Sequence, residues 1–405
     1  MGTAHPLEDG GKTVQRLVSA RSFMTRVAFV VPGSGWMGGA SYFRNLVLAL
    51  SESPQLGIEP VFLAGKGERL PPEFPPVRVI QTSLLDEGAL LWRVRSLWRG
   101  RFGTDSLLDR KLRKSGIGLL SHDGDLGIRA KTPTIGWIAD FQHRWLPDFF
   151  SPEERKRRDA AYDIICRRSM RIVVSSEVAR SDLANFFPQG AEKARVLRFV
   201  DCSASSIPGR GIAELERKYA FRHPYLLLPN QFWAHKNHGI VMEAIRILRD
   251  SGRSVTVLAT GDTHDYRNPL FFGTIMRERA AHRIEDLFRV LGPVPYEDLV
   301  GLMRHAAALV NPSLFEGWST VVEEAKSLGK RILLSDIPVH REQAPERGTY
   351  FDPADATALS CLLWQVCSEQ DAGEEGWWAS RAAGMLPIRR REFARTYAQI
   401  VAECT

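Results

Sequence analysis

The stretch that most constrains the fold of this 405-residue chain is residues 306–336. A short apolar run ends at the breaker formed by residues 311–313 (Asn-Pro-Ser). A capping box at Thr320 and Glu323 then predicts the start of a helix, and Gly329 stands where that helix should end, before another apolar run. This order of strand, loop, helix and strand predicts a βαβ unit in a parallel sheet.

Two carboxylates lie in this unit, Glu316 in the loop before the helix and Glu324 in its first turns. Ligands of open parallel sheets bind beyond the carboxyl ends of the strands, near helix N-termini that attract anions. Gly317 would let a ligand approach the backbone closely, and carboxylates accept hydrogen bonds from vicinal hydroxyls. The pattern therefore suits a ligand with phosphates and many hydroxyls. In the alternative interpretation, both glutamates only complement the helix dipole.

Composition places the chain among globular proteins, with 44% hydrophobic and 25% charged residues, and its length suits two domains. Residues 1–23 have no apolar core and are expected to be a disordered extension rather than a signal peptide. No apolar run reaches about 18 residues, so we expect no membrane span. The five cysteines show no paired spacing, which fits a reducing cytosol and neither a disulfide framework nor a zinc site.

A glycine fingerprint of dinucleotide-binding proteins, Gly33-x-Gly35-x-x-Gly38, follows the apolar strand pattern at 26–31. That fingerprint requires an acidic residue at the end of the next strand to hold the ribose. The next strand, expected at 60–64, ends in Ala-Gly-Lys instead. A NAD-dependent dehydrogenase is therefore an unfavoured alternative.

The elements of residues 306–336 resemble the Glu-x7-Glu motif of retaining GT-B glycosyltransferases of the group 1, family 4 type. The resemblance implies an α/β fold in which two Rossmann-like domains with parallel sheets face each other across a cleft. It also implies that Glu324 holds the nucleotide ribose and that Glu316 contacts the donor sugar. The backbone N–H groups that would reach the diphosphate or sugar belong to Gly317, Trp318, Ser319 and Thr320.

The same resemblance divides the chain. It implies an N-terminal acceptor domain at 24–203, a linker at 204–214, a nucleotide-sugar donor domain at 215–385 and a C-terminal helix at 386–405 that returns to the first domain. The linker begins in a Ser-, Pro- and Gly-rich stretch, which also marks it without the resemblance.

A second group of donor-binding residues is expected around Lys236, at the N-terminus of a helix. A lysine there would clamp a diphosphate, although a lysine exposed on a loop is the alternative. The Lys236-Asn237 pair resembles the diphosphate-binding lysine of the family, with Gln231 where many relatives carry Arg. By the same resemblance, Val294 would contact the base, and Gly38 and Gly39 would let the diphosphate approach the first domain.

In the first domain, residues 137–143 (Trp-Ile-Ala-Asp-Phe-Gln-His) precede a helix that begins at Ser151 and Pro152. This segment resembles a subgroup of the family that builds surface polysaccharides. Many relatives place a His directly before the Asp, where this chain has Ala139. We therefore expect Asp140 on the acceptor side and treat His143 as a candidate catalytic residue, with a purely structural histidine as the alternative.

The function expected from this resemblance is transfer of a sugar, with retention, from a nucleotide-diphosphate sugar to a glycan or lipid-linked acceptor, without a metal or other cofactor. Lys236 and the helix N-termini would stabilise the charge of the departing diphosphate. A catalytically inactive sugar-nucleotide-binding scaffold is the alternative from another class of protein, because Gln231 and Ala139 depart from the common pattern.

The net charge of +7 is concentrated in residues 91–115, which carry eight basic and two acidic residues. No nucleic-acid recognition module accompanies them, so we expect no nucleic-acid partner. A helix expected from about Ala89 places apolar residues on one face, which makes this segment a candidate for contact with an anionic membrane surface. A solvated basic helix packed on the domain is the alternative. We expect a cytoplasmic protein. If residues 91–115 contact a membrane, we expect that contact to be peripheral and at the inner face of the membrane.

Overall fold

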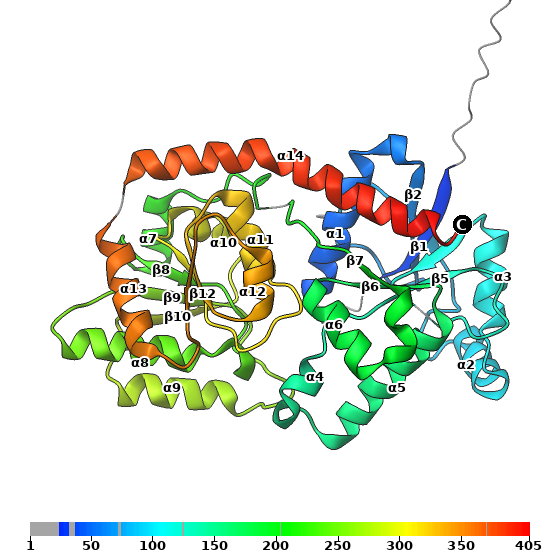
Figure 1. Ribbon diagram of the computed structural model, residues 1–405, viewed down its shortest axis with the longest axis horizontal. Helices are drawn as coiled ribbons and strands as arrows, with labels where there is room; N and C mark the ends of the chain where they lie inside the picture. Colours follow the sequence, from blue (N-terminus) through cyan, green and yellow to red (C-terminus); the bar gives the residue numbers. More distant parts are fainter. Residues whose placement is uncertain (1–23, 32–36, 72–73, 124, 203, 370) are drawn as a thin grey trace, which may run out of the picture.

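The computed structural model describes residues 24–31, 37–71, 74–123, 125–202, 204–369 and 371–405. Two α/β units lie beside each other, and one long helix runs along both (Figure 1). The expected extension at 1–23 and the fingerprint residues Gly33 and Gly35 lie outside the described residues.

The first domain is built on a seven-stranded parallel sheet with the order β3-β2-β1-β4-β5-β6-β7. The strand β1, third in this order, carries a continuous apolar run at 27–30, as expected of a parallel strand in a sheet that helices cover on both faces. The strands are β1 (Thr25–Val30), β2 (Ile58–Ala64), β3 (Arg78–Gln81), β4 (Leu119–Ser121), β5 (Thr134–Trp137), β6 (Arg171–Val174) and β7 (Ala194–Val196). The helices are α1 (Met37–Ser51), α2 (Leu90–Phe102), α3 (Ser106–Lys114), α4 (Gln142–Trp145), α5 (Pro152–Arg168) and α6 (Glu177–Phe186).

The second domain is built on a six-stranded parallel sheet with the order β10-β9-β8-β11-β12-β13. The strands are β8 (Leu226–Leu228), β9 (Val257–Thr260), β10 (Phe288–Gly292), β11 (Leu309–Asn311), β12 (Ile332–Ser335) and β13 (Gly348–Phe351). The helices are α7 (Ile212–Tyr219), α8 (His238–Asp250), α9 (Phe271–Ala281), α10 (Tyr296–His305), α11 (Thr320–Leu328), α12 (Pro338–Gln343) and α13 (Ala356–Ser368). The expectation of two parallel-sheet α/β domains is confirmed.

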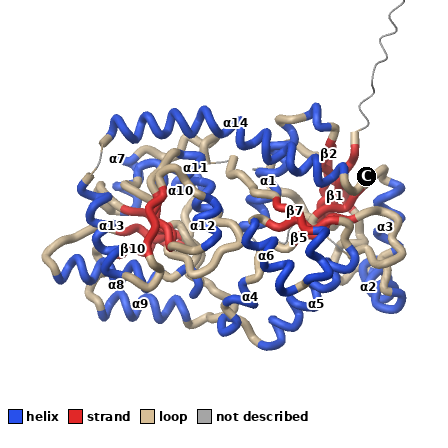
Figure 2. Tube along the Cα trace, viewed as in Figure 1, coloured by secondary structure: helices blue, strands red, loops and turns tan. Residues whose placement is uncertain are grey.

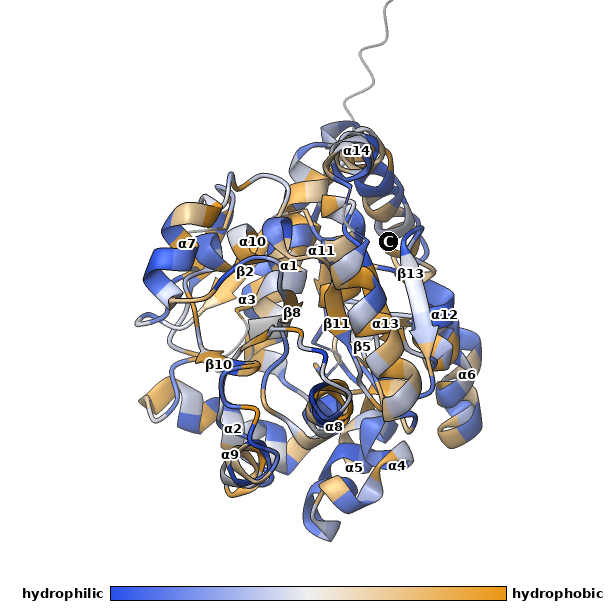
Figure 3. Ribbon diagram, turned by 90° about the vertical axis from the view of Figure 1, so that its left-hand side faces the viewer, coloured by the Kyte–Doolittle hydropathy of each residue, from blue (hydrophilic) through white to orange (hydrophobic). Residues whose placement is uncertain are grey.

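Both sheets lie inside the molecule with helices outside them (Figure 2). In the view along the long axis, the buried strand β11 is coloured as hydrophobic, whereas the covering helices alternate between hydrophobic and hydrophilic residues (Figure 3). Among the described residues, no helix has both the length and the apolar character that crossing a membrane requires.

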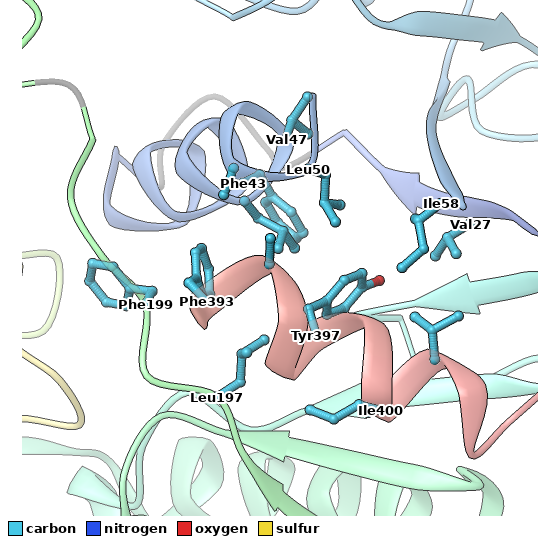
Figure 4. Packing of buried hydrophobic residues seen from close by; sticks show 14 of the residues in the cluster. Val27, Phe43, Val47, Leu50, Ile58, Leu197, Phe199, Phe393, Tyr397 and Ile400 are labelled. Carbon is cyan, nitrogen blue, oxygen red and sulfur yellow. The ribbon is translucent and has the colours of Figure 1, made fainter. Parts of the chain in front are cut away.

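The helix α14 (Ala372–Ala402) begins in the second domain and ends against the first. The expected boundary between residues 385 and 386 therefore falls inside one continuous helix, next to Pro387. Its last turns insert Phe393, Tyr397 and Ile400 into the hydrophobic core of the first domain, where they meet residues of α1, β1 and β2 (Figure 4).

Candidate functional site

The loop between β11 and α11 lies at the carboxyl end of a central strand of the second sheet. Ser319 caps α11 by accepting a hydrogen bond from the backbone N–H of Val322, one residue earlier than the expected cap at Thr320. Gly329 ends the helix in the left-handed region with a φ of 69°. Glu323 completes no capping box, because its carboxylate binds Gln343, Lys326 and Arg389 instead. The expected helix is therefore present, with a different cap.

Glu316 and Lys236 lie in different loops of the second domain and form an ion pair. The Nζ of Lys236 lies 2.5 Å from Oε1 of Glu316, and the two side chains are only 16% and 10% exposed. Lys236 ends a 3-10 turn before α8, and the next residue, Asn237, adopts a left-handed conformation there. The side-chain amide of Asn237 donates to the carbonyls of Pro312 and Pro353, which ties together three loops at the edge of the sheet.

The electrostatics keep Glu316 ionised. Burial by itself raises the pKa of this carboxyl, but the Lys236 ammonium and hydrogen bonds from Lys236 and Ser313 outweigh burial, so the pKa lies below its usual value. The hydroxyl of Ser313 donates to Glu316 at 2.7 Å and also lies 2.7 Å from Oδ1 of Asn311. Glu316 is therefore held as a carboxylate in a fixed position.

Glu324, the expected ribose-binding residue, lies on α11 and is half-buried at the domain interface. Burial and the nearby carboxylate of Asp201 raise its pKa well above the usual value, and Arg44 of the first domain opposes that rise. A carboxyl with such a raised pKa holds a proton more readily than an exposed one and can then donate as well as accept a hydrogen bond.

Gly317 touches the first domain directly. A Cβ atom placed on it would lie 2.3 Å from the carbonyl oxygen of Ala139 and 2.9 Å from Cβ of Asp140. No side chain fits there without movement. The structure therefore gives Gly317 a role that the sequence interpretation did not include, which is to allow close contact between the loop of Glu316 and the loop of Asp140.

Trp318 extends this contact between domains. Its indole N–H donates to the backbone carbonyl of Phe199 at 3.2 Å, and its ring packs against the hydrophobic core of the first domain. The carboxylate of Asp140 accepts the backbone N–H of Gln142 at 2.9 Å. The expected acceptor-side and donor-side loops are thus neighbours.

His143 points into the first domain. Its side chain is fully buried, Nε2 lies 3.0 Å from Oδ1 of Asp159 on α5, and its ring lies edge-on to that of Tyr162. Burial lowers the pKa of His143, with Asp159 opposing that shift. Because the ring is bonded to α5, a direct contact with a substrate would require it to leave this position. The geometry favours the structural alternative.

The remaining expected donor residues occupy varied positions. Gln231 is half-buried in the loop after β8, and Val294 packs beside the core under α10. The backbone N–H of Ser319 donates to the side chain of Gln343, so this group already has a protein acceptor. Gly38 and Gly39 lie in the first turn of α1 rather than in the turn that precedes it.

Three residues at the domain interface were missed from the sequence. Asp201 and Arg44 act on Glu324, as described. Arg267 donates to the side chain of Gln142 at 2.8 Å, and its guanidinium lies over the rings of Phe150 and Trp233. The available signal was the position of Asp201, three residues before the expected linker. Arg44 lies far from Glu324 in the sequence and Arg267 far from Gln142, although Arg267 also pairs with Asp265, two residues earlier, at 3.0 Å.

The dehydrogenase alternative finds no support in the described residues. The strand β2 ends at Ala64, and its acidic residue Glu59 lies near its start, where it pairs with Arg26 at 2.7 Å. Within the described ranges, no group of three or more His, Cys, Asp or Glu side chains could hold a metal ion.

The two parallel-sheet domains, joined in this way, have the GT-B fold of glycosyltransferases. This confirms the fold expected from the sequence. Residues 223–368 match the family described as "Glycosyl transferases group 1". This match covers most of the second domain and less than half of the chain.

Several known proteins are similar to this chain in sequence or structure. The chain is 27% identical to O-antigen chain mannosyltransferase B of Escherichia coli over 48% of its own length and 50% of that protein. It is 22% identical to O-antigen chain mannosyltransferase RfbU of Salmonella typhimurium over 70% of its length and 72% of that protein. The solved structure of Anabaena Alr3699/HepE in complex with UDP and glucose has a TM-score of 0.66 at 15% identity, covering 93% of this chain and 99% of that one. The match to the E. coli relative spans half of that relative's length.

Proposed function

We propose that this chain is a retaining glycosyltransferase that moves a sugar from a nucleotide-diphosphate sugar to a glycan or lipid-linked acceptor of a surface polysaccharide. The observation that carries the proposal is the Lys236–Glu316 ion pair at the carboxyl edge of the second sheet. It places one cation and one carboxylate where ligands of open α/β sheets bind. The names of the two O-antigen transferases support the product class.

In this proposal Lys236 exchanges its partner during the reaction. The free protein neutralises Lys236 with Glu316, and a bound diphosphate would compete for the same ammonium group. Glu316, released from part of this pairing, would accept hydrogen bonds from donor-sugar hydroxyls. Lys236 and the N-termini of α8 and α11 would then stabilise the negative charge that develops on the diphosphate, without a metal ion.

The transfer step needs no protein nucleophile. The bond between the anomeric carbon and the phosphate oxygen breaks, and its electron pair leaves with the diphosphate. The acceptor oxygen bonds to the anomeric carbon on the same face, and its proton passes to the departing phosphate oxygen. Glu324 would hold the ribose, Val294 the base, and Asp140 would face the acceptor. His143 would support the Asp140 loop from inside the first domain.

The donor can be identified by binding. We would measure thermal unfolding with UDP-, GDP- and dTDP-linked sugars, since a ligand that binds only the folded protein raises the unfolding temperature. The stabilising donor would then be incubated with polysaccharide precursors, and the anomeric configuration of the product would be read by NMR. Stabilisation without transfer or donor hydrolysis would favour the inactive scaffold. An inverted product would refute retention.

A further inference from the structure

The helix α2 lies at the end of the first domain farthest from the second (Figure 1). It packs on the domain with the side that carries Trp92, Arg95 and Arg99, and none of its residues is fully buried. Nε of Arg95 lies 2.6 Å from Oδ2 of Asp105 in a pair that is 13% and 1% exposed, and Arg95 also donates to the carbonyl of Leu84. Arg99 pairs with Asp125 at 2.6 Å. A helix on a globular protein normally buries its apolar side, whereas most apolar side chains of α2 are exposed.

The opposite side of α2 presents apolar side chains to solvent. Leu90 and Leu97 are 76% and 75% exposed, and the rings of Trp98 and Phe102 contact each other with their centroids 4.6 Å apart. We call this surface the α2 apolar face. Its members on α2 are Leu90, Leu91, Val94, Leu97, Trp98 and Phe102.

A second segment adds to this face. An isolated antiparallel bridge pairs Thr104, just beyond the end of α2, with Gly127. A Cβ atom on Gly127 would lie 2.3 Å from the carbonyl oxygen of Gly103, so the contact depends on the glycine. The next residue, Ile128, is 78% exposed. The chain thus brings another apolar side chain to the C-terminal end of α2, although burying all of these residues would have been the usual outcome of folding.

The charge around the α2 apolar face is positive. Arg93 and Arg101 are exposed on α2 itself, and within the described ranges neither pairs with a carboxylate. Glu87, before α2, is exposed, but the three aspartates nearest to the arginines already have partners. Asp105 binds Arg95, Asp109 binds Thr132 and Arg113, and Asp125 binds Arg99 and Arg168. Further basic residues on α3 are Arg110, Lys111 and Lys114.

We propose that the α2 apolar face docks on the surface of a bilayer that contains anionic lipids. A helix of 13 residues is roughly 20 Å long, too short to cross a hydrocarbon core of about 30 Å, but suited to lie in the interface plane. Leucine, tryptophan and phenylalanine would enter the headgroup boundary, while arginines beside them meet lipid phosphates. Charge complementarity selects this partner, because a second copy of the chain would bring the same positive charge to the contact.

The sequence predicted a candidate membrane contact for residues 91–115 as a whole, with apolar residues on one face of its helix and arginines on the other. In the structure Arg95 and Arg99 hold α2 on the domain, so replacing them would loosen the helix. Among the described arginines of α2, Arg93 and Arg101 are the two without a carboxylate partner and are therefore available to lipid. The exposed apolar residues make the main contact.

A matched pair of substitutions tests the proposal. Leu97 and Leu270 are 75% and 78% exposed, on different domains. We would measure co-sedimentation of the full chain with phosphatidylcholine vesicles with and without phosphatidylglycerol. Burial of a leucine is worth about 1.5–3 kcal/mol, so Leu97→Glu should lower the partition coefficient at least about tenfold, and Leu270→Glu less than about twofold.

Charge can be tested in the same way. Arg93→Ser with Arg101→Ser should weaken binding to anionic vesicles several-fold, and the loss should shrink as salt is raised. The control is Arg217→Ser with Arg222→Ser, which removes the same charge from exposed positions of the second domain. Equal effects of the two pairs would show that only net charge matters and would overturn the assignment to α2.

Other outcomes would also overturn it. One is absence of wild-type binding to phosphatidylglycerol vesicles at low salt. Another is self-association of the wild type in sedimentation that Leu97→Glu abolishes, which would identify a contact between copies. Donor binding, and transfer to a water-soluble acceptor, should be unchanged in Leu97→Glu. Failure of the proposed sugar transfer in the wild type would therefore be distinguished from failure of membrane docking.

Discussion

The two sides of the domain interface are held in place by different kinds of side-chain interaction. On the second-domain side, buried polar groups support the Glu316 loop. Asn311 accepts from Asn230 and donates to Ser319 at 2.7 Å, and the hydroxyl oxygen of Ser313 lies 2.7 Å from its Oδ1. On the first-domain side the rings of Tyr42 and Trp137 stack, with centroids 4.6 Å apart and planes 19° apart, among further aromatic side chains.

These two kinds of interaction have different structural effects. A fully bonded polar network fixes the position of charged groups, because each member would be costly to leave unpaired. Aromatic packing fixes the position of whole loops without selecting a charge. We infer that the second domain determines which charged ligand binds, and that the first domain determines how closely the opposing loops approach. The predictions below test that division.

The largest expected effect is that of Lys236→Ala on transfer. Loss of one preorganised group that stabilises developing charge should lower turnover about 10²–10³-fold. Steady-state kinetics with the identified donor would measure this, with the exposed Lys66→Ala as control. Lys236→Ala also leaves the Glu316 carboxylate without its ion-pair partner. The double variant Lys236→Ala with Glu316→Gln removes that carboxylate charge too, so any remaining loss of turnover is due to the missing ammonium group at the diphosphate. A loss of affinity for the free nucleoside equal to that for the diphosphate would place Lys236 elsewhere.

A smaller effect is expected for Glu324→Ala on nucleotide binding. The pKa of Glu324 is raised, so we use the value of an ordinary hydrogen bond to the ribose, roughly 0.5–1.5 kcal/mol, which calorimetry can resolve. The control ligand is the same nucleotide without its ribose hydroxyls. The affinity of the protein for this control ligand should not change with Glu324→Ala. An equal loss for both nucleotides would remove Glu324 from the ribose.

Gly317→Ala should affect the contact between domains. The added methyl would lie 2.3 Å from the carbonyl oxygen of Ala139, and overpacking of this kind costs roughly 1–3 kcal/mol. Urea unfolding would measure the change in free energy of unfolding. Gly67→Ala is the control, because a methyl there meets no atom within 4 Å. If both alanines are equally tolerated, close approach of the two loops is unimportant for stability.

The last prediction concerns a histidine beside the polar network. Burial lowers the pKa of His238 to about 3, so folding favours its neutral ring, which stacks on Phe232. The resulting stability is complete above the usual pKa of about 6.5 and is lost as the pH falls from there toward 3. Between pH 7 and 5 the wild type should lose about 1–2 kcal/mol more free energy of unfolding than His238→Phe. Parallel pH profiles would contradict this prediction.

Local signals made much of the fold predictable. The apolar runs predicted the strands, and Ser151 with Pro152 predicted the start of α5, where Ser151 does accept the backbone N–H of Glu154. The loop containing Glu316 was found because its breaker, glycines and carboxylates are close together in the sequence. Such features depend on neighbours within a few residues.

Features set by distant partners were not predictable. Glu323 was expected in a capping box, yet it binds Arg389, 66 residues later. His143 lies beside a polar loop in the sequence, but its orientation is decided by Asp159 on the next helix. The packing of α2 with most of its apolar side chains exposed depends on Asp105 and Asp125, whose pairing with arginines no periodicity reveals.

The path of α14 has a consequence for how the protein is made. The strands of the first domain are complete once Val196 has been added, but their core lacks Phe393, Tyr397 and Ile400 until nearly the whole chain exists. At roughly 5–20 residues per second, translation of the intervening residues takes about 10–40 s. During that interval the nascent chain carries an uncovered apolar seam beside α1. The domain that is synthesised first is therefore the one that is finished last.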